Sequence, residues 1–171
     1  VVLSRGLGDV YKRQDLYGGT WNQFSNTFKD IGIEVRFVDP KDPNDFANAT
    51  DDKTRAYFAE TLPNPKLQVF PIKEVAAIGR KQGIPLIVDN TAAPIICRPL
   101  DHGAAIVVHS TTKYIGGHGT SIGGIIVDAG GFDWAGAGDR QPALNTPDPS
   151  YHGAIFSLSL IHISEPTRQH H

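Results

Sequence analysis

Short apolar runs alternate with helix-like stretches along residues 15–157, and this alternation is the feature that most constrains the fold. The runs are rich in Val, Ile, Leu and Phe and are bounded by turn residues, which is typical of strands. Several are continuously apolar, as strands covered on both faces of a sheet should be. The predicted strands are residues 33–38, 55–60, 85–89, 105–110 and 123–128.

Two of the intervening stretches have the pattern of helices. Residues 71–83 carry apolar positions at i, i+3, i+4 and i+7, with Pro71 at the start and Gly83 as the expected end. Residues 22–30 are expected to form another helix, ended by Gly32. Strands that alternate with helices over this length predict an α/β fold with a mostly parallel sheet and helical crossovers. The apolar face of the longer helix consists of Ile72, Val75, Ala76 and Gly79.

Composition excludes several classes of protein. The 171 residues are 40% hydrophobic and 20% charged, which fits one globular domain and excludes wholesale disorder. A net charge of −2 gives no electrostatic attraction to nucleic acid, and no apolar run approaches the ~20 residues that span a bilayer. The single cysteine, Cys97, excludes a disulfide framework and suits a reducing compartment. We therefore expect a cytoplasmic protein without nucleic-acid or membrane partners.

The two ends of the chain do not resemble natural protein sequence. One set of codons for SRGLGDVYKRQ, residues 4–14, has a reverse complement that translates as LSLIHISEPTR, residues 158–168. That DNA resembles the transposase adaptor used to prepare sequencing libraries. We therefore expect residues 1–14 and 158–171 to be adaptor-derived and leave them out of the fold prediction. The chain also opens on Val1 and contains no methionine, so we expect a fragment.

Polar residues follow three of the predicted strands, at residues 60–61, 89–91 and 110–113. Ligands of open α/β sheets bind beyond the carboxyl ends of the strands, so these groups are expected to converge. Hydroxyls and loop N–H groups suit a phosphate, a carboxylate suits a protonated ring nitrogen, and a lysine can form a Schiff base. The spacing alone leaves Lys113 open as an ordinary solvated lysine.

Five segments carry a resemblance to a known family, in the right order along residues 15–157. They are DLYGGT, ETLPNP, VDNTAAP, HSTTKYIGGHGTSIGG and PDPSYHG. Together they resemble the Cys/Met-metabolism family of pyridoxal 5′-phosphate (PLP) enzymes. The resemblance implies a partial PLP-dependent transferase of fold type I, in which residues 15–157 form the central part of the PLP-binding large domain.

Carried over position by position, the resemblance implies roles for the residues around the lysine motif. Lys113 would be the catalytic lysine that forms the Schiff base with PLP. Asp89 would pair with the pyridinium nitrogen, although an Asp at a strand end can also be a simple helix cap. Ser110 and Thr112 would bind the cofactor phosphate.

Three further residues receive roles in the same way. Tyr17 would stack on the ring face and take part in catalysis, and Asn64 would lie near the phenolic oxygen of the ring. Either residue could instead be an ordinary turn residue. Glu60 would lie behind these groups, without touching the cofactor.

Other residues with reactive side chains carry no such prediction. Cys97 is expected to be an inert buried thiol. His102, His109 and His118 do not match a zinc pattern, so we expect no metal site. The glycines of residues 116–124 lack the spacing of a dinucleotide-binding fingerprint.

The segment after the lysine implies a particular reaction. GGHGTSIGG resembles the loop of the O-acetylhomoserine sulfhydrylase branch, which joins O-acetyl-L-homoserine to sulfide or a small thiol and releases acetate. Cystathionine γ-synthase, cystathionine γ-lyase and methionine γ-lyase of the same family are alternatives, as are a non-catalytic α/β binding domain and a truncated, inactive product. The resemblance also implies a homotetrameric full-length parent and a substrate-carboxylate arginine in a C-terminal domain outside these residues.

Overall fold

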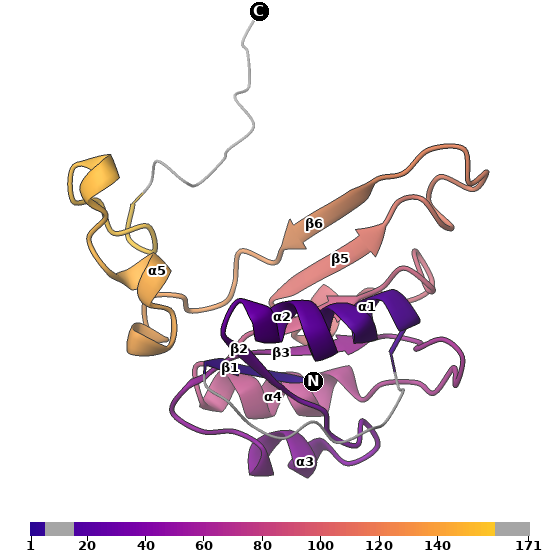
Figure 1. Cartoon of the computed structure of the whole chain (residues 1–171), viewed down its shortest axis with the longest axis horizontal. Helices are drawn as coiled ribbons and strands as arrows, with labels where there is room; N and C mark the ends of the chain where they lie inside the picture. Colours follow the sequence, from indigo (N-terminus) through magenta and orange to yellow (C-terminus); the bar gives the residue numbers. More distant parts are fainter. Residues whose placement is uncertain (6–15, 160–171) are drawn as a thin grey trace, which may run out of the picture.

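The computed structural model describes residues 1–5 and 16–159 (Figure 1). A six-stranded sheet with the order β2-β1-β3-β4-β5-β6 forms its centre. Each of the five predicted strands is present, with ends within two residues of the prediction. The strands are β1 (Val2–Arg5), β2 (Ile33–Arg36), β3 (Thr54–Glu60), β4 (Leu86–Asp89), β5 (Ile106–Ser110) and β6 (Gly124–Asp128).

The two predicted helices also form. Helix α4 (Ile72–Lys81) buries the four apolar residues that the spacing indicated. The other helix begins earlier than predicted, because the amide of Trp21 already donates to the carbonyl of Tyr17 at 2.9 Å. It runs through α1 (Gly18–Asn22), a π-helical turn η1 (Gln23–Thr27) and α2 (Phe28–Asp30).

Helix α3 (Pro43–Asn48) was not predicted. The sequence nevertheless specifies where the helix begins. The Asp42 side chain caps it by accepting a hydrogen bond from the amide of Asn44, and Pro43 occupies the first helical turn. The helix contributes one fully buried apolar residue, Phe46, so it offers no periodic pattern to detect. The remaining helical turns are η2 (Pro99–His102), η3 (Gly138–Arg140), α5 (Pro142–Asn145) and η4 (Pro149–Tyr151).

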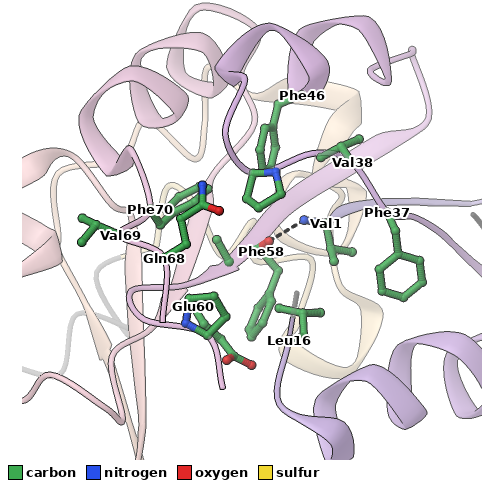
Figure 2. A pocket seen from close by; sticks show the side chains of 13 residues that line it. Val1, Leu16, Phe37, Val38, Phe46, Phe58, Glu60, Gln68, Val69 and Phe70 are labelled. Carbon is green, nitrogen blue, oxygen red and sulfur yellow. Dashed lines mark hydrogen bonds between the residues drawn. The ribbon is translucent and has the colours of Figure 1, made fainter. Parts of the chain in front are cut away.

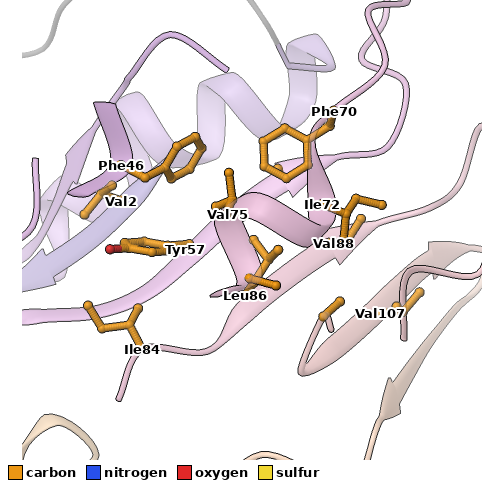
Figure 3. Close-up of a cluster of buried hydrophobic side chains, with 13 residues drawn as sticks. Val2, Phe46, Tyr57, Phe70, Ile72, Val75, Ile84, Leu86, Val88 and Val107 are labelled. Atoms are coloured by element: carbon orange, nitrogen blue, oxygen red, sulfur yellow. The ribbon is translucent and has the colours of Figure 1, made fainter. Parts of the chain in front are cut away.

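Hydrophobic clusters lie on both faces of the sheet. Helices α3 and α4 cover one face and α1–α2 cover the other (Figure 1). In the larger cluster, Tyr57 of β3 packs among side chains of α3 and α4 (Figure 3). The neighbours Val1 and Val2 belong to different clusters, since successive strand residues point to opposite faces. The strands near the middle of the sheet are therefore covered on both sides.

The α/β class is confirmed, but the sheet is mixed rather than mostly parallel. Strands β3, β4 and β5 run parallel to one another, whereas β6 runs antiparallel to β5. A parallel return normally needs a crossover helix. The connection between β5 and β6 is rich in glycine and forms no helix, so the chain turns back beside β5. The β5–β6 pair extends away from the helices (Figure 1), and every residue of β6 is exposed.

The segment that we left out of the fold prediction contributes strand β1. It lies between β2 and β3 and runs antiparallel to both. Without β1, strands β2 and β3 would each present unpaired backbone groups, and an extended apolar segment can pair with such groups. Val1 and Val2 supply the apolar side chains of this segment. The pairing does not test whether the segment derives from an adaptor. Residues 6–15 and 160–171, most of the two proposed adaptor segments, lie outside the described residues.

Gly79 in α4 is expected to tolerate no larger side chain. A Cβ atom at this position would lie 2.5 Å from the carbonyl oxygen of Ile84 and 3.2 Å from the Tyr57 ring. Although alanine favours helix, this overlap should outweigh the gain, so Gly79→Ala should lower the free energy of unfolding by about 1–2 kcal/mol. Urea unfolding measures the change, with Lys73→Ala on the exposed face of α4 as the control. An unchanged or more stable Gly79→Ala chain would contradict the close packing.

Candidate functional site

A cleft of about 890 Å³ opens at the carboxyl ends of β3, β4 and β5. It is built from four segments of the chain: the turn before α1, the loop after β3, the end of β4 with the residues that follow it, and the loop that joins β5 to β6. The structure brings all six predicted site residues to this cleft. They are Tyr17, Asn64, Asp89, Ser110, Thr112 and Lys113.

A chain of hydrogen bonds joins the ends of β4 and β5. The Asp89 carboxylate accepts from the amide of Thr91 at 2.8 Å. The Thr91 hydroxyl in turn accepts from the amide of Ser110 at 2.7 Å. Asp89 and Ser110 are therefore held at one edge of the sheet by Thr91. Sequence reasoning placed Thr91 among the polar residues of this edge but did not give it this bridging role.

The loop that carries the lysine is folded tightly around Thr111 and Thr112. The Thr112 hydroxyl accepts from the amide of Gly123 at 3.0 Å and donates to its carbonyl at 3.3 Å. A Cβ atom on Gly123 would lie 2.6 Å from the Thr111 hydroxyl, and one on Gly116 would lie 2.6 Å from the Thr111 carbonyl oxygen. Glycine is required at both positions for this close approach. The resulting turn places Lys113 on the wall of the cleft.

Tyr17 and Asn64 stand on the other side of the cleft. The Tyr17 side chain is 51% exposed and precedes the first residue of α1. Asn64 lies in the loop after β3 and is also exposed. Both side chains are thus available to a ligand, and their backbone amides share a partner, the carboxylate of Glu60.

Glu60 is the one buried carboxylate on the wall of the cleft, at 8% exposure. Burial raises its pKa to about 7 from an ordinary value of 4.5, and the neighbouring Asp89 carboxylate adds to the rise. Hydrogen bonds from the amides of Tyr17 and Asn64 to the Glu60 carboxylate oppose it. Within the described part of the cleft, the titratable side chains besides Glu60 and Asp89 are those of Lys113, Tyr17 and Tyr114.

The pKa of Glu60 predicts a pH-dependent stability. Because the folded value lies above the unfolded one, the favourable contribution is complete below pH 4.5 and is lost as the pH rises through about 7. Glu60→Gln stays neutral, so it should unfold with a free energy higher than that of the parent chain by on the order of 2 kcal/mol at pH 8, and with little difference at pH 4.5. Urea unfolding at both pH values tests this. Glu74→Gln on the exposed face of α4 is the control, and an equal effect of Glu60→Gln at the two pH values would refute the prediction.

Other reactive groups of the described residues lie outside this cleft. Cys97 is half-buried, and burial raises the pKa of its thiol. Within residues 1–5 and 16–159, no group of three or more His, Cys, Asp or Glu side chains could hold a metal ion. None of the helices in these ranges has the length and apolar character needed to cross a membrane.

Comparison with known proteins identifies the class to which this fold and cleft belong. The sequence profile described as "Cys/Met metabolism PLP-dependent enzyme" matches residues 3–146. The chain therefore belongs to the Cys/Met-metabolism family of PLP-dependent enzymes. The partial fold type I domain that the resemblance implied is confirmed by this match and by the structural neighbours.

Two relatives carry the names of a sulfhydrylase and a synthase. The chain is 50% identical over 149 residues to an O-acetyl-L-homoserine sulfhydrylase of Leptospira meyeri, a match that covers 86% of the chain and 33% of the relative. It is 49% identical over 144 residues to a homocysteine/cysteine synthase of Saccharomyces cerevisiae, covering 83% of the chain and 32% of the relative. The chain thus spans about a third of the length of the curated relatives it matches.

A solved structure agrees with these relatives. A putative O-acetylhomoserine (thiol)-lyase of Campylobacter jejuni aligns with a TM-score of 0.83 and 37% sequence identity, covering 94% of this chain and 40% of its own. That structure carries an N′-pyridoxyl-lysine-5′-monophosphate at one of its positions. The cleft described above contains groups that suit such a cofactor: a carboxylate, two hydroxyls, an amine and an aromatic ring.

Proposed function

We propose that this chain is the central, cofactor-binding part of an O-acetylhomoserine sulfhydrylase. In the proposed reaction, the carbon–oxygen bond at Cγ of O-acetyl-L-homoserine breaks and a bond from Cγ to the sulfur of sulfide or a small thiol forms. The products are homocysteine or a thioether, together with acetate. The observation that carries the proposal is the convergence of six side chains from four segments on one cleft. The names of the relatives support the choice of substrates.

The residues of the strand ends would hold PLP in this cleft. The Asp89 carboxylate would accept a hydrogen bond from the protonated pyridinium nitrogen, and its own hydrogen bond from the Thr91 amide would keep it oriented. The hydroxyls of Ser110 and Thr112 would donate to the phosphate. For Thr112 this requires rotation of the hydroxyl, because its proton now faces the carbonyl of Gly123.

Tyr17 and Asn64 would flank the cofactor ring. The Tyr17 ring is exposed to the cleft and would stack on the pyridine face. The Asn64 side-chain amide would donate to the phenolic oxygen of the ring. When bound, PLP supplies an electron sink for the negative charge that develops at the substrate Cα.

Lys113 would carry the proton transfers. Its Nζ would hold the cofactor covalently in the resting enzyme and, when free, would act as the base that removes the proton from the substrate Cα. The same amine would then move a proton from Cβ, and acetate would leave from Cγ. A lysine acts as a base only while its amine is neutral. Asp89, by keeping the ring nitrogen protonated, would make the Cα proton easier to remove.

Further properties of the whole protein belong to the same proposal. The full-length enzyme would be a cytoplasmic homotetramer that acts on a small amino acid and on sulfide or a thiol. The net charge of −2 supports the absence of a nucleic-acid partner. A cystathionine γ-synthase, cystathionine γ-lyase or methionine γ-lyase activity would use the same cofactor residues. Comparing O-acetyl-L-homoserine, cystathionine and methionine as substrates of the full-length enzyme separates the two lyases, and comparing sulfide with cysteine as the nucleophile separates cystathionine γ-synthase.

Cofactor attachment tests the core of the proposal on this chain. The purified chain is incubated with PLP, reduced with borohydride and digested, and the modified lysines are identified by mass spectrometry. We expect modification at Lys113 to exceed modification at exposed lysines such as Lys81. Asp89→Ala should lower the labelling of Lys113 alone. Labelling spread evenly over the lysines, with no effect of Asp89→Ala, would refute the assigned site.

A further inference from the structure

Glu60 occupies an unusual place for an acidic side chain. It is the last residue of β3 and lies beside Asp89 in the parallel register of β3 and β4. On one side it borders the large cleft, and on the other a small cavity of about 30 Å³ that is mostly apolar. Figure 2 shows Glu60 at the edge of this cavity, next to Leu16 and Phe58. A carboxylate in such surroundings is costly unless it is well hydrogen-bonded.

The hydrogen bonds of Glu60 connect two segments that are distant in the sequence. Its Oε1 accepts from the backbone amide of Tyr17 at 2.8 Å, across 43 positions of the chain. The backbone amide of Asn64 also faces the carboxylate and lowers its pKa. One carboxylate therefore holds the turn that leads into α1 and the loop that follows β3. These segments carry the two side chains proposed to flank the cofactor ring.

The ionised form of Glu60 also lowers the stability of the fold. Burial and the neighbouring Asp89 make the ionised form of Glu60 unfavourable at neutral pH, so the fold would be more stable with a neutral side chain of the same shape that keeps a hydrogen-bond acceptor. Within the described residues, the hydrogen-bond donors that face this carboxylate are the amides of Tyr17 and Asn64. A costly group whose hydrogen-bond donors lie on the two walls of one cleft suits a role in arranging those walls.

We propose that Glu60 is a positioning residue: its carboxylate clamps the Tyr17 turn and the Asn64 loop together, so that both side chains meet the same bound cofactor. The clamp deepens the proposed function and rests on it for the identity of the ligand. The carboxylate itself does not contact the cofactor. Removing it releases both segments at once, whereas removing a glutamate elsewhere does not.

The first experiment uses the chain without cofactor. Hydrogen exchange followed by mass spectrometry compares the parent chain with Glu60→Ala and Glu60→Gln. In Glu60→Ala, the peptides that cover residues 16–24 and 61–70 should both exchange at least tenfold faster, while α4 stays protected. Glu60→Gln keeps one carbonyl acceptor and should restore most of the protection. Faster exchange in only one of the two segments, or in neither, would overturn the clamp.

The matched control is Glu34→Ala. The Glu34 side chain is also largely buried and hydrogen-bonded, but its partner is Arg36 on β2, away from the cleft. Its loss should leave the exchange of residues 16–24 and 61–70 unchanged. If Glu34→Ala accelerated exchange in these segments as much as Glu60→Ala, the effect would reflect general destabilisation, and the clamp would be refuted.

The second experiment measures the dissociation constant of PLP in a double-mutant cycle. Glu60→Ala should weaken binding about tenfold in the parent chain but less than threefold when Tyr17→Ala is already present, because only the part of the effect that runs through Asn64 then remains. Equal weakening in both backgrounds would overturn the clamp. A parent chain that does not bind PLP would overturn the proposed function, while the exchange experiment would still decide whether Glu60 couples the two segments.

Discussion

Lys113→Ala is expected to lower acetate release from O-acetyl-L-homoserine at least about a thousandfold in a full-length chain that carries residues 16–157. General acid–base catalysis by one positioned side chain contributes about 10²–10⁴-fold. The substitution also removes the amine that attaches the cofactor, so the loss should lie toward or beyond the upper end of that range. Acetate release in the presence of sulfide is measured as kcat and as kcat/KM.

Two further variants serve as controls, one for the charge of Lys113 and one for its position in the cleft. Lys113→Arg keeps a positive charge but stays protonated at neutral pH, so it should be as inactive as Lys113→Ala. Lys81→Ala removes an exposed lysine at the end of α4, away from the cleft, and should leave turnover unchanged. If Lys113→Ala kept more than a tenth of the parent kcat, Lys113 would not be the catalytic lysine.

The strands and α4 could be predicted because their patterns are local. Continuous apolar runs marked β3, β4 and β5, and the spacing of Ile72, Val75, Ala76 and Gly79 marked the buried face of α4. The relative direction of neighbouring strands could not be predicted in this way, because it depends on how the connection between them folds. The glycines between β5 and β6 left room for a tight loop around Thr111, and the antiparallel return followed from that packing.

Strand β1 shows a second limit of local reasoning. Nothing within residues 1–5 specifies a place in the sheet, and only the open position between β2 and β3 explains why they pair there. The same holds for α3, which is specified by a cap at Asp42 and one buried ring, Phe46, rather than by a repeat.

The candidate site was predictable to the extent that sheet topology fixes it. Asp89 and Ser110 had to share an edge, because each ends a parallel strand and the two strands are neighbours. Contacts that depend on side-chain direction could not be predicted. The bridging hydroxyl of Thr91 and the position of Glu60 between two cavities require the folded chain, since both depend on segments that meet only in three dimensions.

The 171-residue chain by itself is expected not to sustain acetate release, even where PLP attaches to Lys113. Lys113 is exposed on the wall of an open cleft, and it is the single basic side chain that lines the described part of that cleft. Once Lys113 is engaged with the cofactor, the lining offers no second cation for the carboxylate of the substrate. A poorly held substrate loses most of the advantage of proximity, which can reach about 7–11 kcal/mol of the barrier.

The exposed apolar surface should add a second obstacle. Ile95 and Ile122 are 95% and 96% exposed, and Ile126 lies on the uncovered strand β6. Apolar side chains on an open strand favour association between copies of a chain, so we expect self-association as well as inactivity. The test follows acetate release by the purified chain with PLP, O-acetyl-L-homoserine and sulfide, beside a full-length relative. Sustained release that disappears in Lys113→Ala would mean that residues 16–159 already hold the substrate carboxylate. The cleft would then need no further part of the protein to complete it.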